Sequence, residues 1–338
     1  MSPYELTQEL GSMCLVLKKV STSVMTGLES DNTRIDDLFR RRARLLQEIR
    51  TYFSSEEVTE VNTPILSAFG SCEPTLRNLT LNRSKRKYLR TSPESYLKQL
   101  LSQNIGDIYE IGPVFRDEEI GCFHLEEFTM VEWYRTNIDL LALIADVSRL
   151  LARCGYQTTI DVVTYAELFR HASGLDPHSC DNSELVSCAS KRGVSLKEGD
   201  LNDRAFLLDA VYVSTVDPLL KSFKPVFIID YPKEHRAYAR LSRTDEAVAL
   251  RFELIINGIE IANGYDEITE SAEQKDRFNA ENKLRKLRGL EQIELDTPWL
   301  AALSSGVPSV CGVALGLERL EMVLWEVEDI RKLSLNIY

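Results

Sequence analysis

The chain has 338 residues, 44% of them hydrophobic, and a formal net charge of −12. A chain of this size can bury a large core as one domain, or as one domain with an appendage, and its acidic balance argues against a nonspecific nucleic-acid binder, which relies on clustered Lys and Arg. No apolar run reaches the roughly 18 residues that span a bilayer, and polar residues interrupt the N-terminal segment where a signal peptide needs an apolar stretch, so we expect a cytoplasmic protein without membrane contact.

The first half of the chain alternates helical and strand patterns. Residues 1–30 show weak helical patterning and are left as an N-terminal extension of unknown role. Apolar residues then recur at helical spacing from 35 to 53 behind Asp31, which predicts a long amphipathic helix capped by that aspartate. The next predicted elements are a short strand at 57–66, a hairpin around 76–90, a helix opening near Pro93, strands at about 107–117 and 126–135, and a helix closed by Gly155.

The second half returns to strands after a helical stretch. Residues 160–222 contain several short helical patterns, which we interpret as an insertion. Strand patterns follow at 225–232 and 248–268, then a charged helix over 270–288. Strands joined by hairpin turns, with helices grouped elsewhere, predict an α+β catalytic domain over 31–338, with an antiparallel sheet flanked by helices.

The strand from residue 127 places a carboxylate among aromatic side chains. Side chains alternate along a strand, so one face is predicted to hold Phe128, Met130, Glu132 and Tyr134. On the preceding strand, Arg116 and Glu118 are also expected to point together. A structural ion pair between Arg116 and Glu132 is the alternative to a functional site.

The Asn257-Gly258 pair is the preferred two-residue hairpin turn, and it sets a register. It predicts that 256 lies opposite 259, 255 opposite 260 and 253 opposite 262. Glu253 and Glu260 then become diagonal neighbours on one face, roughly 7 Å apart at the backbone. A Mg²⁺ ion between them resolves their repulsion, because Mg²⁺ takes one or two protein carboxylates and leaves its other positions to water and phosphate oxygens. Two acids on a solvated hairpin face are the alternative.

The stretch 312–319 reads GVALGLER. Gly312, Ala314 and Gly316 alternate along a predicted strand and form a flat floor on which a planar ring could lie, with Arg319 following in a helix. Simple close packing is the alternative. Neither G-x-G-x-x-G nor a P-loop occurs in the chain, so a Rossmann or Walker site is not expected. Two arginines, two carboxylates, Phe128 and this floor together predict an ATP site of another kind.

These stretches resemble the three signature motifs of class II aminoacyl-tRNA synthetases. The segment 34–66 is similar to motif 1, VFRDEE with FTMVEWY to motif 2, and GVALGLERLEMVL to motif 3. TSPESYLKQLL, HLEEFTMVEWY and GIEIANGYDEITE resemble lysyl-tRNA synthetase, and most closely its truncated GenX/PoxA relatives, which attach lysine to elongation factor P. The similarity covers about residues 34–328. Too few residues precede it for an anticodon-binding domain, so tRNA is not the expected acceptor.

The resemblance implies a role for each matching residue. Arg116 would hold the α-phosphate and the substrate carboxylate, and Arg319 the γ-phosphate; these two are the expected catalytic residues. The expected ATP-binding residues are Arg116, Glu118, His124, Phe128, Gly316 and Arg319, with Glu253 and Glu260 binding Mg²⁺. The expected lysine-binding residues are Ser92, Glu94, Glu132, Tyr134, Asn263, Glu267 and Ala314. Glu132 would therefore receive an ammonium group.

The resemblance also implies (R)-β-lysine as the preferred donor, elongation factor P as the acceptor, and a homodimer formed through motif 1. Three positions depart from the usual family pattern: Leu125, Glu318 and Tyr265, which is followed by Asp266. Glu318 is a longer acid than the usual aspartate and is expected to shift Arg319. Two other functions stay open: a lysyl-adenylate-forming paralogue that acts on a small molecule, a carrier or tRNA, and a catalytically inactive regulatory paralogue.

Overall fold

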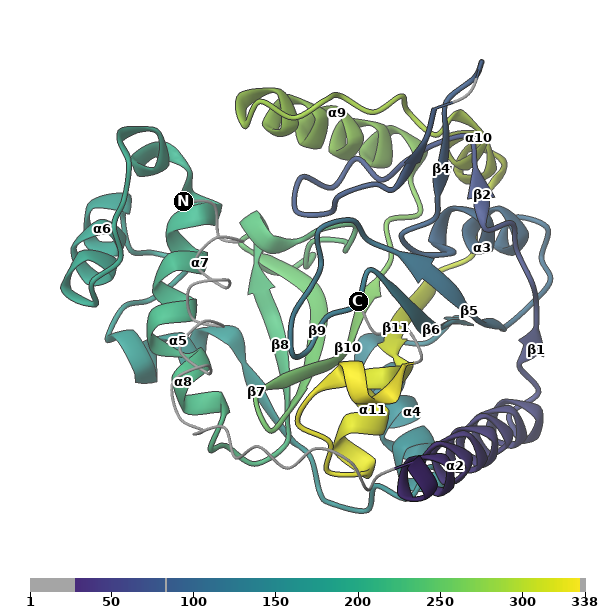
Figure 1. Ribbon diagram of the computed structural model, residues 1–338. Helices are drawn as coiled ribbons and strands as arrows, with labels where there is room; N and C mark the ends of the chain where they lie inside the picture. The colour runs from purple at the N-terminus through teal and green to yellow at the C-terminus, as the bar shows by residue number, and fades with distance from the viewer. Residues whose placement is uncertain (1–27, 83, 335–338) are drawn as a thin grey trace.

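A computed structural model describes residues 28–82 and 84–334, so most of the predicted extension 1–30 lies outside the described residues. Its centre is an eight-stranded sheet in the order β1-β5-β6-β11-β10-β9-β8-β7 (Figure 1). Neighbouring strands from β5 to β8 run antiparallel, as predicted, whereas β1 runs parallel to β5 and β7 parallel to β8 at the two edges. A second sheet has three antiparallel strands in the order β2-β4-β3.

Most predicted strands are present, although the one expected over 57–66 shortens to two residues. The strand at Asp161–Thr164 was not predicted, because only helical patterns were expected over 160–222. The large sheet contains β1 Thr59–Glu60, β5 Ile108–Phe115, β6 Glu127–Thr136, β7 Asp161–Thr164, β8 Val226–Pro232, β9 Val248–Ile256, β10 Ile259–Asp266 and β11 Val310–Gly316. The small sheet contains β2 Leu66–Ser67, β3 Thr80–Leu81 and β4 Lys87–Leu89.

The helices lie around the large sheet. They are α2 Leu28–Ser55, α3 Glu94–Leu101, α4 Leu140–Arg153, α5 Tyr165–Ser173, α6 Asn182–Lys191, α7 Arg204–Thr215, α8 Asp217–Leu220, α9 Ser271–Leu287, α10 Thr297–Ser305 and α11 Leu317–Leu324, with 3-10 turns at Glu198–Asn202, Lys233–His235 and Ile330–Leu333. Because α2 already begins at Leu28, the predicted cap at Asp31 is wrong. Among the described residues, we find no helix with the length and apolar character needed to cross a bilayer.

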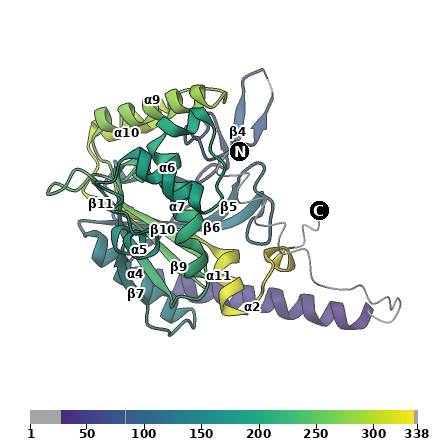
Figure 2. The same cartoon turned by 90° about the vertical axis from the view of Figure 1, so that its left-hand side faces the viewer.

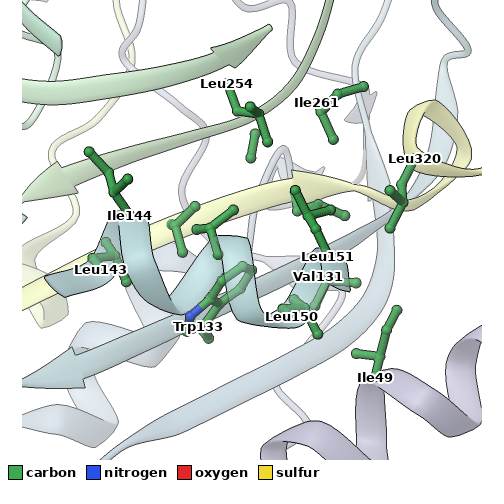
Figure 3. Packing of buried hydrophobic residues seen from close by; sticks show 14 of the residues in the cluster. Ile49, Val131, Trp133, Leu143, Ile144, Leu150, Leu151, Leu254, Ile261 and Leu320 are labelled. Carbon is green, nitrogen blue, oxygen red and sulfur yellow. The ribbon is translucent and has the colours of Figure 1, made fainter. Parts of the chain in front are cut away.

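One face of the large sheet is covered by α2 and α4 and forms the main core. Trp133 and Val131 of β6 are fully buried there against Ile49 of α2 and Leu150 of α4 (Figure 3). Val313 and Leu315 of β11 belong to the same cluster, as the alternation along that strand predicted. The opposite face of these strands is therefore free to carry polar side chains.

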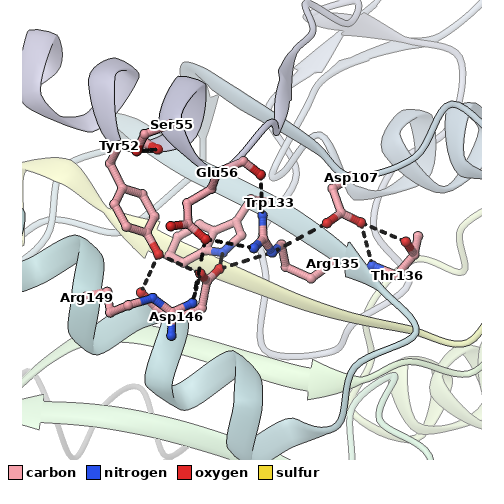
Figure 4. Close-up of polar contacts among 9 residues, drawn as sticks. All are labelled: Tyr52, Ser55, Glu56, Asp107, Trp133, Arg135, Thr136, Asp146 and Arg149. Carbon is pink, nitrogen blue, oxygen red and sulfur yellow. Dashed lines mark hydrogen bonds and ion pairs between the residues drawn. The ribbon is translucent and has the colours of Figure 1, made fainter.

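A buried carboxylate ties this core together (Figure 4). Asp146 of α4 is 1% exposed and accepts hydrogen bonds from the Tyr52 hydroxyl at 2.6 Å and the Trp133 indole N–H at 3.0 Å. Arg135 lies 3.5 Å from the same carboxylate, and Arg149 lies 2.8 Å from it. One acid thus joins α2, α4 and β6, which fixes the back of the strand that carries Glu132.

The helices between β7 and β8 pack on a second apolar cluster, which includes Phe169, Leu185 and Val211. Figure 1 shows α5, α6 and α7 grouped beside the β7–β8 edge, and Figure 2 shows the same helices from the side. Their place agrees with the segment expected as an insertion over 160–222. The division of the chain into an extension, a catalytic domain and an insertion stays a prediction.

Candidate active site

A row of polar residues crosses the open face of the large sheet. In the strand register, Glu132 lies opposite Ala314, Ala314 opposite Asn263, and Asn263 opposite Glu253. Directly paired residues project to the same face of a sheet, so these four side chains share one surface. The predicted alternation along β6 is confirmed, because Val131 and Trp133 turn to the core.

The hairpin register is confirmed near its turn and wrong farther away. Ile256 pairs with Ile259 and Ile255 with Glu260, as predicted, but Glu253 pairs with Asn263 rather than with Ala262. The reason is a β-bulge between Glu260 and Ala262, which places one extra residue in β10.

The bulge changes which residues of β10 face the site. Glu260 and Asn263 are three positions apart yet point the same way, and the Asn263 amide donates a hydrogen bond to Glu260 at 2.9 Å. Glu260 lies opposite Ile255, two residues along β9 from Glu253, so the two acids still share a face.

The two hairpin acids sit among cations. Burial raises the pKa of Glu253, although Arg251, which is ion-paired with it, opposes this effect. For Glu260, burial alone would raise the pKa, but the nearby Arg319 guanidinium keeps it below its ordinary value. Arg319 Nη1 lies 3.5 Å from the Glu260 carboxylate and donates to the Glu260 backbone carbonyl at 3.0 Å.

A cavity of about 50 Å³ opens over this part of the sheet. Arg116 and Phe128 both line this cavity, and the Arg116 guanidinium lies 5.2 Å from the centre of the Phe128 ring. Burial, followed by the charge of Arg319, lowers the pKa of His124 to about 4, so this imidazole is neutral at physiological pH. The lining contains five of the six residues predicted for ATP: Arg116, His124, Phe128, Gly316 and Arg319. It also contains Glu260, which was predicted for Mg²⁺, and Asn263 and Ala314, which were predicted for lysine.

Glu118 does not line this cavity, whereas the next residue, Glu119, does. Glu118 has a positive φ of 64° and pairs with Arg77 at 3.4 Å on the exposed loop. Glu119 lines the cavity instead, 3.9 Å from Arg116, and burial raises its pKa. The alternation used to place Glu118 fails because β5 ends at Phe115.

The other residues predicted for lysine lie in a second, more buried region. Glu132, Tyr134 and Glu267 are each at most 3% exposed, and the Tyr134 hydroxyl donates to Glu132 at 2.8 Å. Burial, strengthened by the charge of Glu94, raises the pKa of Glu132 to about 8. Ser92 and Glu94 lie beside this region, in the lining of a cavity of about 60 Å³.

Gly312 is the point where the floor strand and the acids come closest. A Cβ on Gly312 would lie 2.4 Å from the Tyr134 ring and 2.5 Å from a Glu267 carboxylate oxygen. The atom nearest to a Cβ on Gly316 would belong to the Arg319 side chain, at an ordinary contact distance of 3.7 Å. The floor predicted from the sequence therefore has one glycine that the packing requires and one that it does not.

Comparison of the sequence with models of known protein families identifies the family of this chain. A family model described as tRNA synthetases class II (D, K and N) matches residues 25–335. The chain belongs to this family. The predicted class II synthetase catalytic fold is thereby confirmed.

Several curated relatives of the chain bear the name "Elongation factor P--(R)-beta-lysine ligase". The protein of that name from Histophilus somni (strain 2336) is 38% identical over 304 residues, which cover 88% of this chain and 94% of the relative. The one from Haemophilus influenzae (strain PittGG) is 36% identical over 297 residues, covering 86% and 91%. The one from Pasteurella multocida (strain Pm70) is 38% identical over 289 residues, covering 83% and 89%. The predicted resemblance to the lysine ligases of this class II family is confirmed.

In this class II fold, the motif 2 and motif 3 strands are direct neighbours, because residues 130–136 of β6 pair with the whole of β11. That pairing sets Glu132 beside Ala314, although the two are far apart in the sequence. The roles of individual site residues stay predictions.

The hairpin acids fit a metal ion that arrives with a nucleotide. Within 28–82 and 84–334, no group of three or more His, Cys, Asp or Glu side chains is arranged to hold a metal ion. Glu253 and Glu260 supply two carboxylates on one face, which is the number that Mg²⁺ takes when phosphate oxygens and water complete its shell.

Four charged residues near the site were not predicted as part of it: Arg42, Lys98, Glu119 and Arg251. Lys98 stands four residues after Glu94, a helical spacing that places both on one face of α3.

Proposed function

We propose that the protein activates a lysine-type amino acid with ATP as an aminoacyl-adenylate and transfers it to a lysine side chain of elongation factor P. The names of relatives that match most of the chain support this acceptor and favour (R)-β-lysine as the donor. The main structural support is that Arg116, Arg319 and Phe128 line one cavity, next to a row of buried acids suited to ammonium groups.

Activation is an in-line displacement. A carboxylate oxygen of the amino acid attacks the α-phosphorus of ATP, an O–P bond forms, and the bond to the bridging oxygen breaks as pyrophosphate leaves with the electron pair. The amino-acid carboxylate is already a nucleophile, so no side-chain base is required. The chain would contribute position and charge: Arg116 and Arg319 neutralise the phosphates, and Glu253 and Glu260 hold Mg²⁺ that enters with ATP.

Transfer follows from the adenylate. The neutral amine of the acceptor lysine attacks the acyl carbon, a C–N bond forms, and the C–O bond to AMP breaks. The attacking amine loses its extra proton to solvent, and an amide results. Arg116 and Arg319 would hold the AMP phosphate while this happens.

The decisive measurement is ATP/pyrophosphate exchange over a panel of amino acids that includes α-lysine and (R)-β-lysine. We expect exchange with lysine-type substrates and its loss in Arg116→Ala, because removing one cation leaves the α-phosphate charge without its partner. Arg77→Ala is the matched control, since Arg77 pairs with Glu118 outside the cavity. Unchanged exchange in Arg116→Ala would contradict the assignment, and faster exchange with α-lysine would contradict the choice of donor.

The acceptor is tested separately by mixing the enzyme, ATP and labelled lysine with elongation factor P or with tRNA. Label on the protein alone is the expected result; label on tRNA, or on neither, would overturn this part of the proposal. We also infer a homodimer through α2, the helix of motif 1, and sedimentation at two loading concentrations checks it.

A further inference from the structure

The buried amino-acid region already contains an ammonium group that belongs to the chain. Lys98 of α3 is 1% exposed. Its Nζ donates to Glu94 Oε1 at 2.7 Å and lies 2.7 Å from Glu267 Oε2. The rings of Trp299 and Tyr238 approach it with their centres at 4.8 and 5.9 Å. Two carboxylates and two aromatic faces are the surroundings in which proteins bind an alkylammonium ligand.

Lys98 fixes an acid that also touches the floor strand. One oxygen of Glu267 lies beside the Lys98 ammonium, and the other lies 2.5 Å from the place where a Cβ of Gly312 would be. The carboxylate therefore spans from α3 to β11. The orientation of the Glu267 carboxylate therefore depends on Lys98, which contacts one of its two oxygens.

The charges in this region form one group. Glu94, Glu132 and Glu267 act on one another electrostatically, and Lys98 is the cation among them. Incoming ammonium groups favour the ionised form of all three acids, and the net charge of the group is then −2, which balances the +2 of the two ammonium groups of a diamino acid. Without Lys98, three carboxylates would face one another in a buried site, where repulsion and burial both favour their protonation.

We propose that Lys98 is a positioning residue that acts as the fixed counter-cation of the amino-acid pocket. It orients Glu94 and Glu267 through its contacts with both carboxylates, and it offsets one of the three negative charges that the acids carry when all are ionised, so that two remain for a diamino substrate. This inference rests on the proposed function, because it assigns the charge balance of the same pocket.

The first experiment compares wild type with Lys98→Met, which keeps a similar side-chain volume and removes the charge. We expect the KM for lysine in ATP/pyrophosphate exchange to rise about tenfold or more, the difference that about 1.4 kcal/mol produces. The KM for ATP should stay unchanged, because Lys98 is absent from the lining of the ATP cavity. An unchanged KM for lysine, or an equal rise in both constants, would overturn the inference.

The second experiment separates charge from packing by chemical rescue of Lys98→Ala. The cavity of about 60 Å³ is bordered by Glu94, Tyr238 and Trp299, so a small amine can approach the vacated place. We expect n-butylammonium to restore lysine-dependent exchange in a saturable way and n-butanol to leave it low. Equal rescue by butanol, or no rescue by either while Lys98→Met also behaves as wild type, would reduce Lys98 to a packing role.

The outcomes also distinguish this inference from the proposed function. Absence of exchange by the wild-type enzyme with every amino acid tested would overturn both. Normal wild-type exchange together with an unaltered Lys98→Met variant would overturn the role of Lys98 alone.

Discussion

Gly312→Ala tests how closely the floor strand approaches the amino-acid pocket. The added methyl group would lie 2.4 Å from the Tyr134 ring and 2.5 Å from Glu267. Carbon atoms in contact are normally about 3.5 Å or more apart, so both neighbours must move by about 1 Å. Overpacking of this kind costs about 1–3 kcal/mol. If the displaced groups are those that bind the amino acid, a loss of the same size in transition-state binding lowers kcat/KM for the amino acid about 5- to 150-fold.

The assay is exchange with the amino acid varied at saturating ATP, together with thermal unfolding of each variant. Gly199→Ala is the control outside the site, because its methyl group would lie in open space with no atom within 4 Å beyond its chain neighbours. We expect its melting temperature and its KM for the amino acid to match wild type. If Gly312→Ala also matches wild type in both, the close approach of strand, ring and acid is not a constraint on the pocket.

Three further variants test the core and the two halves of the site. Asp146→Ala should lower the free energy of unfolding in urea by about 3–5 kcal/mol, because it leaves buried donors on Tyr52 and Trp133 without their acceptor; a loss below about 1 kcal/mol would contradict this. Glu132 has its pKa raised by burial from 4.5 to about 8, so the folded chain keeps a proton that the unfolded chain releases, and stability falls as pH rises between these values. Glu132→Gln should reduce that fall, to which Glu267 and Glu321 also contribute because burial raises the pKa of each to about 8. The measurement is the unfolding free energy at pH 5 and pH 8, and an identical pH dependence in wild type and variant would refute the assignment. Glu260→Gln should raise the Mg²⁺ concentration needed for half-maximal exchange without changing the KM for lysine, and an unaltered Mg²⁺ requirement would remove Glu260 from the metal site.

Local sequence patterns were sufficient where one strand or one turn determines the outcome. Alternation along β6 places Val131 and Trp133 in the core and leaves Glu132 on the other face, because the pleat alone determines this. Likewise, the Asn257-Gly258 turn sets the pairing of the residues next to it. Neither result depends on residues distant in the sequence.

The bulge in β10 could not be predicted in this way. A turn fixes register only until an extra residue enters one strand, and nothing between Glu260 and Asn263 marks that residue in the sequence. Its effect appears only in three dimensions, where Glu260 and Asn263 must both face the cavity beside β11.

Lys98 was missed for a different reason. Lysine is rarely fully buried unless it is paired, so a sequence analysis assigns it to the surface. One partner, Glu94, lies on the same helix turn, but the other, Glu267, follows β10 and approaches only after the sheet has formed. The fold thus creates the charge balance that no local pattern contains.

Glu318 connects the site to the long N-terminal helix. Its carboxylate accepts from the Thr129 backbone N–H at 2.9 Å and pairs with Arg42 of α2 at 2.7 Å. The next residue, Arg319, points to the hairpin instead and donates to the carbonyls of Glu260 and Phe123 at 3.0 and 3.1 Å. The longer acid therefore satisfies partners on β6 and α2 while Arg319 keeps its bonds to the nucleotide cavity. Arg42 and Glu318 thus connect α2, the helix through which we expect two copies to pair, to the strand that carries Phe128 and Glu132.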